Sequence, residues 1–255
     1  MMRLITYNVN GIRSAMRKGW IDWLKDVNPD IICLQEIKAS PDQLNDLLIL
    51  EQMGYEHFWY PAQKKGYSGT AIITKLSPKK VTYGCGEHLY DDEGRILMAE
   101  FDDFSVLSTY FPSGTTGDVR QTFKYRFLDD FQQYIDKLKT ETPNLIVSGD
   151  YNICHKPIDI HNPISNKNSS GFLPEERAWM DRFVESGFVD SFRHINPNPH
   201  QYTWWSFRAR ARERNLGWRI DYNMVSQPLQ ARVKNARILS EAVHSDHCPV
   251  LLELE

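Results

Sequence analysis

The chain has 255 residues, of which 41% are hydrophobic and 25% are charged, and its formal net charge is −3. These values are ordinary for a soluble globular protein, and the length is sufficient for one large buried core. The small negative charge argues against a protein that coats nucleic acid indiscriminately but allows a local basic groove. Apolar stretches such as 31–34 are far too short to span a bilayer, and no signal-peptide pattern precedes the first strand. The sequence therefore predicts a cytoplasmic protein with no membrane partner.

Short apolar runs and alternation predict strands, while spacing near 3.6 residues predicts helices. In chain order, the expected strands are 4–9, 30–34, 69–74, 96–101, 105–111, 144–148, 219–225 and 249–254, and the expected helices are 15–27, 41–53, 119–138 and 174–185. Several neighbouring strands are joined by turn-length connections. This favours α+β layers over a singly alternating parallel sheet.

No repeat, low-complexity tract or linker divides the chain, so a single catalytic domain over residues 1–255 is expected. The stretch 155–171 is rich in Asn, Pro and Ser without clear periodicity, which predicts a long functional loop. Four cysteines lie far apart, in no spacing typical of zinc or redox sites. They are interpreted as small buried apolar residues: Cys33, Cys85, Cys154 and Cys248.

Acidic residues follow two of the predicted strands and precede a third. Glu36 and Asp150 each close a short apolar segment, and Asp246-His247 leads into the last one. Because the residue just past a buried strand projects from the sheet edge, these side chains can share one pocket. Several carboxylates, an amide and one histidine, with no serine or cysteine nucleophile motif, predict Mg²⁺-assisted phosphoester hydrolysis. Taken singly, each motif is also typical of a solvated strand end or an Asx turn.

Two further patterns have competing interpretations. Asp221 lies among residues that look buried, so it needs a partner, and His247 is the obvious candidate. The stretch 202–214 interleaves aromatic residues with arginines. In one interpretation, the aromatic residues pack into the core and the charged residues form a solvated face. In the other, the stretch lines a nucleic-acid groove, in which arginines contact phosphates and aromatic rings contact sugars or bases. The glycine-bent stretch 64–69 predicts a second, weaker phosphate contact.

Taken together and in order, the motifs resemble the exonuclease III family of abasic-site DNA endonucleases, within the endonuclease/exonuclease/phosphatase superfamily. They are Asn8-x-Asn10-Gly11, Gln35-Glu36-x-Lys38, Gly66-Tyr67-Ser68-Gly69, Tyr110-x-Pro112, Gly149-Asp150-x-Asn152, Asn215-x-Gly217-Trp218-Arg219-Ile220-Asp221-Tyr222 and Ser245-Asp246-His247. The resemblance covers essentially the whole chain. It implies a DNase I-like, four-layer α/β sandwich, with two mixed β-sheets packed face to face and helices outside.

The resemblance also implies roles for individual residues. Glu36 would be the main Mg²⁺ ligand, Asp150 would deprotonate the attacking water, and His247 would contact a phosphate oxygen. The other implied catalytic residues are Asn8, Tyr110, Asn152 and Asp221, and the other implied metal ligands are Asn10 and Asp246. The implied DNA contacts are Arg13, Lys38, Lys65, Tyr67, Arg95, Asn166 and Arg208. The implied wall of a pocket for the baseless sugar consists of Trp204, Trp218 and Ile220.

Some positions depart from what relatives carry. Asn10 stands where some members have aspartate, Ser113 and Ser169 stand where relatives can have asparagine, and Arg208 stands where some relatives insert a different residue into the duplex. The implied activity is cleavage 5′ of abasic sites in double-stranded DNA to leave a 3′-hydroxyl, with 3′–5′ exonuclease and 3′-end-cleaning activity. Mg²⁺ is the expected cofactor, with Mn²⁺ as an alternative.

The expected partner is duplex DNA with abasic sites or 3′ ends, bound by a monomer. Three alternatives stay open from the residues. The nearest is a phosphoinositide or sphingolipid phosphodiesterase of the same superfamily, which would share fold and catalytic centre. A secreted nuclease of the DNase I kind is disfavoured by the missing signal peptide and disulfide framework. A catalytically inactive DNA-binding protein is disfavoured because every matched position keeps a competent residue.

Overall fold

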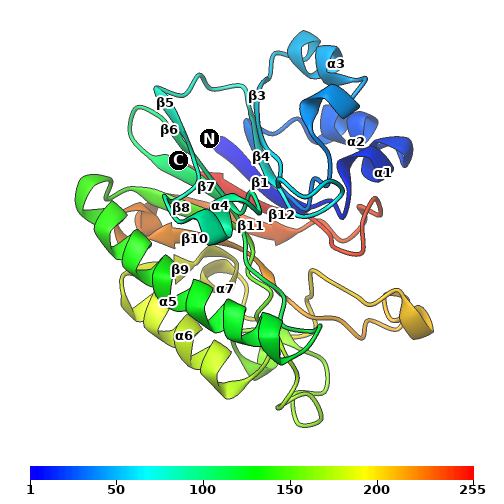
Figure 1. Ribbon diagram of the computed structural model, residues 1–255, viewed down its shortest axis with the longest axis vertical. Coiled ribbons are helices and arrows are strands. Elements are labelled where there is room, and N and C mark those ends of the chain that lie inside the picture. Colours follow the sequence, from blue (N-terminus) through cyan, green and yellow to red (C-terminus); the bar gives the residue numbers. More distant parts are fainter.

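The computed structural model describes residues 1–255 and contains two six-stranded sheets, with helices on both outer faces (Figure 1). The first sheet has the order β11-β12-β1-β2-β4-β3, and its strands are β1 (Met2–Asn8), β2 (Ile31–Gln35), β3 (Glu56–Tyr60), β4 (Thr70–Thr74), β11 (Val233–Ile238) and β12 (Val250–Leu254). The second has the order β5-β6-β7-β8-β10-β9, and its strands are β5 (Lys80–Tyr83), β6 (Ile96–Glu100), β7 (Ser105–Tyr110), β8 (Leu145–Asp150), β9 (Phe188–Asp190) and β10 (Asp221–Ser226). Each sheet is mixed, because β1–β2 and β7–β8 are parallel pairs and the other pairs are antiparallel.

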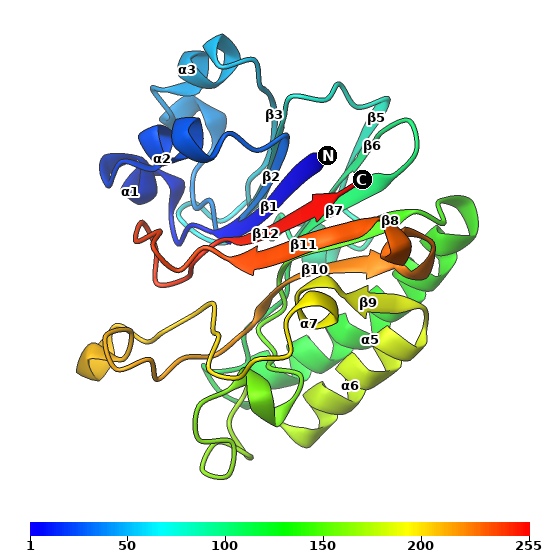
Figure 2. The same ribbon diagram turned by 180° about the vertical axis from the view of Figure 1, so that it is seen from behind.

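The helices cover the two outer faces, as seen from opposite sides in Figures 1 and 2. The helices are α1 (Ile12–Arg17), α2 (Trp20–Val27), α3 (Leu47–Gln52), α4 (His88–Asp91), α5 (Asp118–Glu141), α6 (Pro174–Glu185) and α7 (Ser191–Ile195). The first three lie over the first sheet, whereas α5 and α6 run side by side over the second. This arrangement is the four-layer sandwich that the family resemblance implied, and it agrees with the α+β layers expected from the strand and helix pattern.

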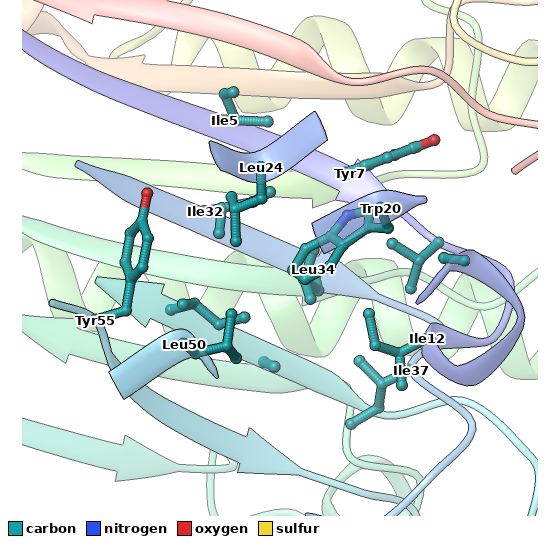
Figure 3. Close-up of a cluster of buried hydrophobic side chains, with 14 of the residues drawn as sticks. Ile5, Tyr7, Ile12, Trp20, Leu24, Ile32, Leu34, Ile37, Leu50 and Tyr55 are labelled. Carbon is teal, nitrogen blue, oxygen red and sulfur yellow. The ribbon is translucent and has the colours of Figure 1, made fainter. Parts of the chain in front are cut away.

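Three apolar clusters hold the layers together. Side chains such as Leu4, Ile146 and Leu252 fill the space between the sheets. Figure 3 shows the second cluster, in which Trp20 and Leu24 of α2 pack on the outer face of the first sheet. The third cluster joins α5 and α6 to the second sheet and is largely aromatic. Because helices cover one face of each sheet and the other sheet covers the second face, the central strands are buried on both sides along almost their whole length.

Several expected elements differ in extent. The predicted helix 15–27 is two helices, because Gly19 adopts a left-handed conformation with φ of +88° between them. The predicted helix 41–53 is a short 3₁₀ turn, Pro41–Gln43, followed by α3. The strands β3, β5, β9 and β11 were not predicted, and they are the four edges of the two sheets. In an edge strand, apolar and polar residues alternate less regularly, because the strand is exposed to solvent on more than one side.

Other expectations can be checked against the fold. The stretch 155–171 is irregular apart from the 3₁₀ turn Pro157–Asp159, as predicted. No cysteine is disulfide-bonded, and three are buried, but Cys85 is only partly buried, so its interpretation as a buried residue was wrong. None of the helices combines the length and apolar character that crossing a membrane requires.

Candidate active site

Strand register brings the catalytic candidates to one end of both sheets. In the second sheet, Asp150 at the end of β8 pairs with Tyr110 of β7 on one side and with Asp221 of β10 on the other. In the first sheet, Asn8 ends β1 and Glu36 directly follows β2. The Asn8 side-chain amide donates to Glu36 Oε1 and to Asp150 Oδ2, both at 2.9 Å. This amide therefore ties the reactive ends of the two sheets together.

His247 and Asp221 form the buried pair expected from the sequence. The imidazole Nδ1 lies 2.9 Å from Asp221 Oδ2 and 3.2 Å from Oδ1. Burial by itself would lower the pKa of His247, but the charge and hydrogen bond of Asp221, with Asp150 and Asp246 nearby, raise the pKa to about 10. The ring is therefore a cation at neutral pH, with Nδ1–H donating to Asp221 and Nε2–H directed toward the site.

Hydrogen bonds fix the orientation of the Asp150 carboxylate. Its Oδ1 accepts from the Asn152 backbone N–H at 2.8 Å, and its Oδ2 accepts from Asn8. Burial and the neighbouring charge of Asp221 raise the pKa of Asp150 to about 7, against the opposing effects of His247 and of these hydrogen bonds. Because a general base works best with a pKa near the working pH, this carboxylate is suited to take a proton from water.

The acidic cluster has a donor set that fits a divalent cation. One ligand atom each from Glu36, Asp150 and His247 lie within 4.8 Å of one another. A protonated imidazole does not coordinate metal, so the carboxylate oxygens are the usable ligands, which is the donor type that hard cations prefer. The other expected ligands, Asn10 and Asp246, are neighbours of this cluster: Asn10 Nδ2 donates to Asp246 Oδ1 at 3.0 Å.

Lys38 joins the two groups of predicted ligands. Its ammonium lies 2.7 Å from Glu36 Oε2 and donates to Asn10 Oδ1 at 2.5 Å. Asp246 accepts three side-chain hydrogen bonds, from Asn10 Nδ2 and Ser245 Oγ to its Oδ1 and from Trp204 Nε1 to its Oδ2, the last at 3.0 Å. Burial would raise the pKa of Asp246, but His247 and these hydrogen bonds together hold it below its usual range. The carboxylate is therefore ionised and placed beside the pocket wall.

Tyr110 is placed by an arginine network. The Arg95 guanidinium lies 4.8 Å from the centre of the Tyr110 ring and donates to the Tyr110 carbonyl at 2.8 Å. It also donates to Glu93 and to the Tyr67 hydroxyl. Arg120 adds further bonds to Glu93 and Tyr67. Arg95, expected to contact DNA, is only 1% exposed, so in this structure it supports two site tyrosines and does not present a free cation.

A pocket of about 500 Å³ opens beside the catalytic groups. Trp204, Trp218 and Ile220, the three predicted wall residues, line it together with Glu36, Tyr110, Asp150, Asn152, Asp246 and His247. The two indole rings meet edge to face with centroids 6.0 Å apart. The pocket is therefore apolar on one side and catalytic on the other.

The rest of the pocket wall carries hydroxyl side chains and one closely packed glycine. It consists of Ser113, Thr115, Ser169, Ser170 and Gly171, of which the sequence had drawn attention only to the first and third. A Cβ on Gly171 would lie 2.9 Å from the Trp218 ring, and the φ of this glycine is +94°. Only glycine thus allows this close approach of backbone to ring. The clue in the sequence was the predicted loop 155–171, which carries the last three of these residues.

A family model described as the Endonuclease/Exonuclease/phosphatase family matches residues 5–247. The chain belongs to this family. An exodeoxyribonuclease of Bacillus subtilis (strain 168) is 44% identical over 253 residues, which cover 98% of each chain. A DNA-(apurinic or apyrimidinic site) endonuclease of Dictyostelium discoideum is 40% identical over 255 residues, covering 98% of this chain and 69% of that protein.

Solved structures agree with this assignment to the Endonuclease/Exonuclease/phosphatase family. An AP endonuclease from Archaeoglobus fulgidus matches with a TM-score of 0.91 and 31% identity, with both chains covered completely. A 3′ phosphatase from Neisseria bound to a product DNA hairpin matches with a TM-score of 0.92 and 28% identity, again over both whole chains. The resemblance inferred from the motifs is therefore confirmed, as are the fold and the enzyme class that it implied.

Around this family's catalytic centre, three predicted DNA contacts are exposed cations. Arg13 lies on α1, Lys65 on the glycine-bent turn, and Arg208 on a segment that projects from the body of the molecule, gold in Figure 1. Asn166 differs, because its side-chain amide donates to the carbonyls of His161 and Asn162. It caps its own loop and leaves its carbonyl oxygen for Ser169 Oγ.

Arg212 is a residue whose place could not be read from the sequence. Its guanidinium donates to the carbonyls of Ser240, Ala242 and Ser245, at distances from 2.6 to 3.1 Å. It also lies over the Trp205 ring at 4.8 Å. The base of the projecting segment is thus fastened to the turn that carries Asp246 and His247. The sequence signalled only an arginine-rich stretch, and the bound carbonyls are 28 to 33 residues away.

Proposed function

We propose that this protein incises duplex DNA on the 5′ side of an abasic site, leaves a 3′-hydroxyl, and also removes nucleotides or blocking groups from 3′ ends. The observation that carries the proposal is the pocket, in which a phosphodiester chemistry site and an apolar indole wall share one cavity of about 500 Å³. A phosphoinositide hydrolase would need the catalytic residues of this pocket but not its apolar indole wall. Relatives named as exodeoxyribonuclease and as abasic-site endonuclease support the DNA substrate.

The chemistry assigned to the side chains is an in-line hydrolysis. Asp150, fixed by Asn8 and Asn152, accepts a proton from the attacking water. His247, held as a cation by Asp221, donates from Nε2 to a phosphoryl oxygen, where negative charge grows in the transition state. The Tyr110 hydroxyl stays protonated, because burial and the nearby carboxylates raise its pKa well above the usual value, so it is a second donor.

Mg²⁺ is the cofactor that we propose, with Glu36 as the principal ligand and Asp246 and Asn10 close by. When bound, it supplies additional neutralisation of the phosphate charge, and Mn²⁺ shares this preference for oxygen ligands. The ligands are carboxylate and amide oxygens without a thiolate, which disfavours zinc. Lys38 keeps Glu36 and Asn10 in place and lowers the repulsion among the acids.

Substrate choice follows from the shape of the pocket. A sugar without a base costs least to turn out of a duplex, because no stacking is lost, and it is small enough for a pocket closed by Trp204, Trp218 and Ile220. Exposed cations on several sides, including Arg13, Lys65 and Arg208, would hold the phosphates of the flanking duplex. A monomer and a cytoplasmic location stay predictions.

One comparison tests the proposal directly. Purified protein is incubated with Mg²⁺ and either a labelled duplex carrying one abasic residue, the same duplex intact, or a phosphoinositide, and single-turnover rates are measured. We expect rapid cleavage 5′ of the abasic residue, slow internal cleavage of the intact duplex, and no phosphoinositide hydrolysis. Excess EDTA should abolish incision, and Glu36→Gln should lower the rate at a given Mg²⁺ concentration while DNA affinity is preserved. Equal internal cleavage of both duplexes, or preference for the phosphoinositide, would overturn the proposal.

A further inference from the structure

A fully buried ion pair lies behind the pocket wall. Lys124 of α5 and Glu176 of α6 are both 0% exposed, and their Nζ and Oε1 atoms are 2.6 Å apart. Lys124 also donates to the Asn152 carbonyl at 2.7 Å. The second carboxylate oxygen of Glu176 accepts from the Gly171 backbone N–H at 2.7 Å and from that of Leu173 at 3.0 Å. The pair therefore holds backbone atoms of both loops that line the pocket.

Packing of the two helices does not explain this pair. An aromatic and aliphatic cluster, with Phe127, Phe131 and Phe183 among its members, already joins α5 and α6 to the sheet. Removing two charges from water is costly, and an apolar pair of similar volume is often as stable or more stable. Neither residue belongs to the catalytic centre described above. What distinguishes this ion pair from an apolar pair is therefore the set of backbone groups that it binds.

The backbone groups that the ion pair binds belong to the wall of the pocket. Asn152 and Gly171 both line it, and the position of a Cβ on Gly171 would be 3.2 Å from the Asn152 carbonyl oxygen and 2.9 Å from the Trp218 ring. That carbonyl oxygen is the atom that Lys124 binds. Gln121 extends the contact, because it donates to Glu176 and accepts from Ser170. One movement of the pair would thus displace the loop on which the indole rests.

We propose that the Lys124–Glu176 ion pair is a positioning element that holds Asn152 and Gly171 together and thereby determines how strictly the pocket rejects a nucleotide that carries a base. The inference rests on the proposed abasic-site activity and adds a specificity device to it. Without the pair, Gly171 and the Trp218 ring gain freedom to move outward. The pocket then admits larger groups, and discrimination falls more than the chemistry.

The test compares single-turnover rates on abasic and intact duplexes for Lys124→Met, Glu176→Gln and the double variant Lys124→Met/Glu176→Met. The ratio of the two rates should fall about tenfold in each single variant, since small misplacements at a site are costly. The double variant should be more stable than either single variant, because neither partner is left as an unpaired buried charge. Its ratio of abasic to intact cleavage rates should nevertheless stay low. Amide exchange in segments 150–154 and 169–173 should accelerate in all three.

A matched control is available on the same helix. Lys139 also bonds a backbone carbonyl, that of Ser186, and an acid, Asp136, but it lies about 22 Å further along α5. Lys139→Met should leave the ratio and the exchange of both segments within twofold of wild type. If discrimination returned with stability in the double variant, or if the exchange of segments 150–154 and 169–173 were unchanged, the pair would be merely structural and the inference wrong. If wild type itself failed to distinguish the duplexes, the proposed function would fail, while the exchange measurement would still decide on the pair.

Discussion

Replacing Asp159 by Asn should destabilise the protein in a way that depends on pH. Asp159 is fully buried, and its Oδ1 accepts from Arg219 Nε at 2.8 Å and from Arg193 Nε and Nη2 at 3.0 and 2.8 Å. Arg219 also donates to Asp190, with the shortest contact, Nη2 to Oδ2, at 2.6 Å. The substitution leaves two guanidinium groups with one carboxylate. Breaking a buried pair commonly costs about 3–5 kcal/mol, and because Asn still accepts a hydrogen bond we expect about 3 kcal/mol.

The pH dependence has a definite sign. Burial on its own would raise the pKa of Asp159, but the charges and N–H groups of Arg219 and Arg193 outweigh it and hold the pKa below the ordinary 3.8. The stabilisation from the charged form is therefore complete above the unfolded-state value near 3.8. It is lost as the pH falls through the lower folded-state pKa. Wild type and Asp159→Asn should differ most near neutral pH and converge in acid.

Urea unfolding of both proteins from pH 7 down to pH 3 measures this difference, and calorimetry at pH 7 should show a melting temperature lower by about 6–12 °C. Arg219 lies between the pocket residues Trp218 and Ile220, so abasic incision should slow as well. Arg232→Met is a suitable control, because that arginine also binds an acid and a carbonyl but is partly exposed and distant from the site. A loss below about 1 kcal/mol at pH 7, or a gap between the two proteins that did not begin to narrow below about pH 4, would refute the reasoning.

Further predictions concern the chemistry, the pocket and the DNA contacts. Asp150→Asn and His247→Asn should each slow single-turnover incision at least about 100-fold with folding intact, since that is the usual effect of losing a general base or an electrostatic donor; rates within a few-fold of wild type would contradict the assigned roles. Trp218→Ala should slow abasic incision and narrow the difference in rate between abasic and intact duplexes, because a steric filter is removed; an unchanged ratio would speak against the pocket as the filter. Lys65→Ala and Arg208→Ala should weaken DNA binding and reduce the salt slope of the binding constant by about one unit each, measured by titration at several salt concentrations; unchanged affinity and slope would make both residues ordinary surface cations.

Much of the site could be predicted because its residues follow strands with a strong sequence signal. The strands β2 and β8 are buried along their whole length, so their apolar runs are clear, and Glu36 and Asp150 stand at their ends. The partnership of Asp221 with His247 was predictable for a similar reason, since a carboxylate among apolar residues requires a partner. Asp221 and Asp150 then become neighbours through strand register alone.

Other features depended on contacts that leave little trace in the sequence. Edge strands such as β5 and β9 are short and partly exposed, so no apolar alternation marks them. Arg95 looked like an available cation, and only the fold showed that the Tyr110 carbonyl, Glu93 and Tyr67 occupy its donors.

The residue pattern and the motifs were enough to predict the layered fold, the central strands, and the acids, amides and histidine at the strand ends. The backbone groups that polar side chains bind could be identified only in the folded molecule. Arg212 reaches three carbonyls of the turn before His247, and Lys124 with Glu176 reaches Asn152 and Gly171. Every residue except proline carries the same backbone N–H donor and C=O acceptor. A side chain that binds a backbone group can therefore have almost any residue as its partner, and the sequence gives no sign of which one it is.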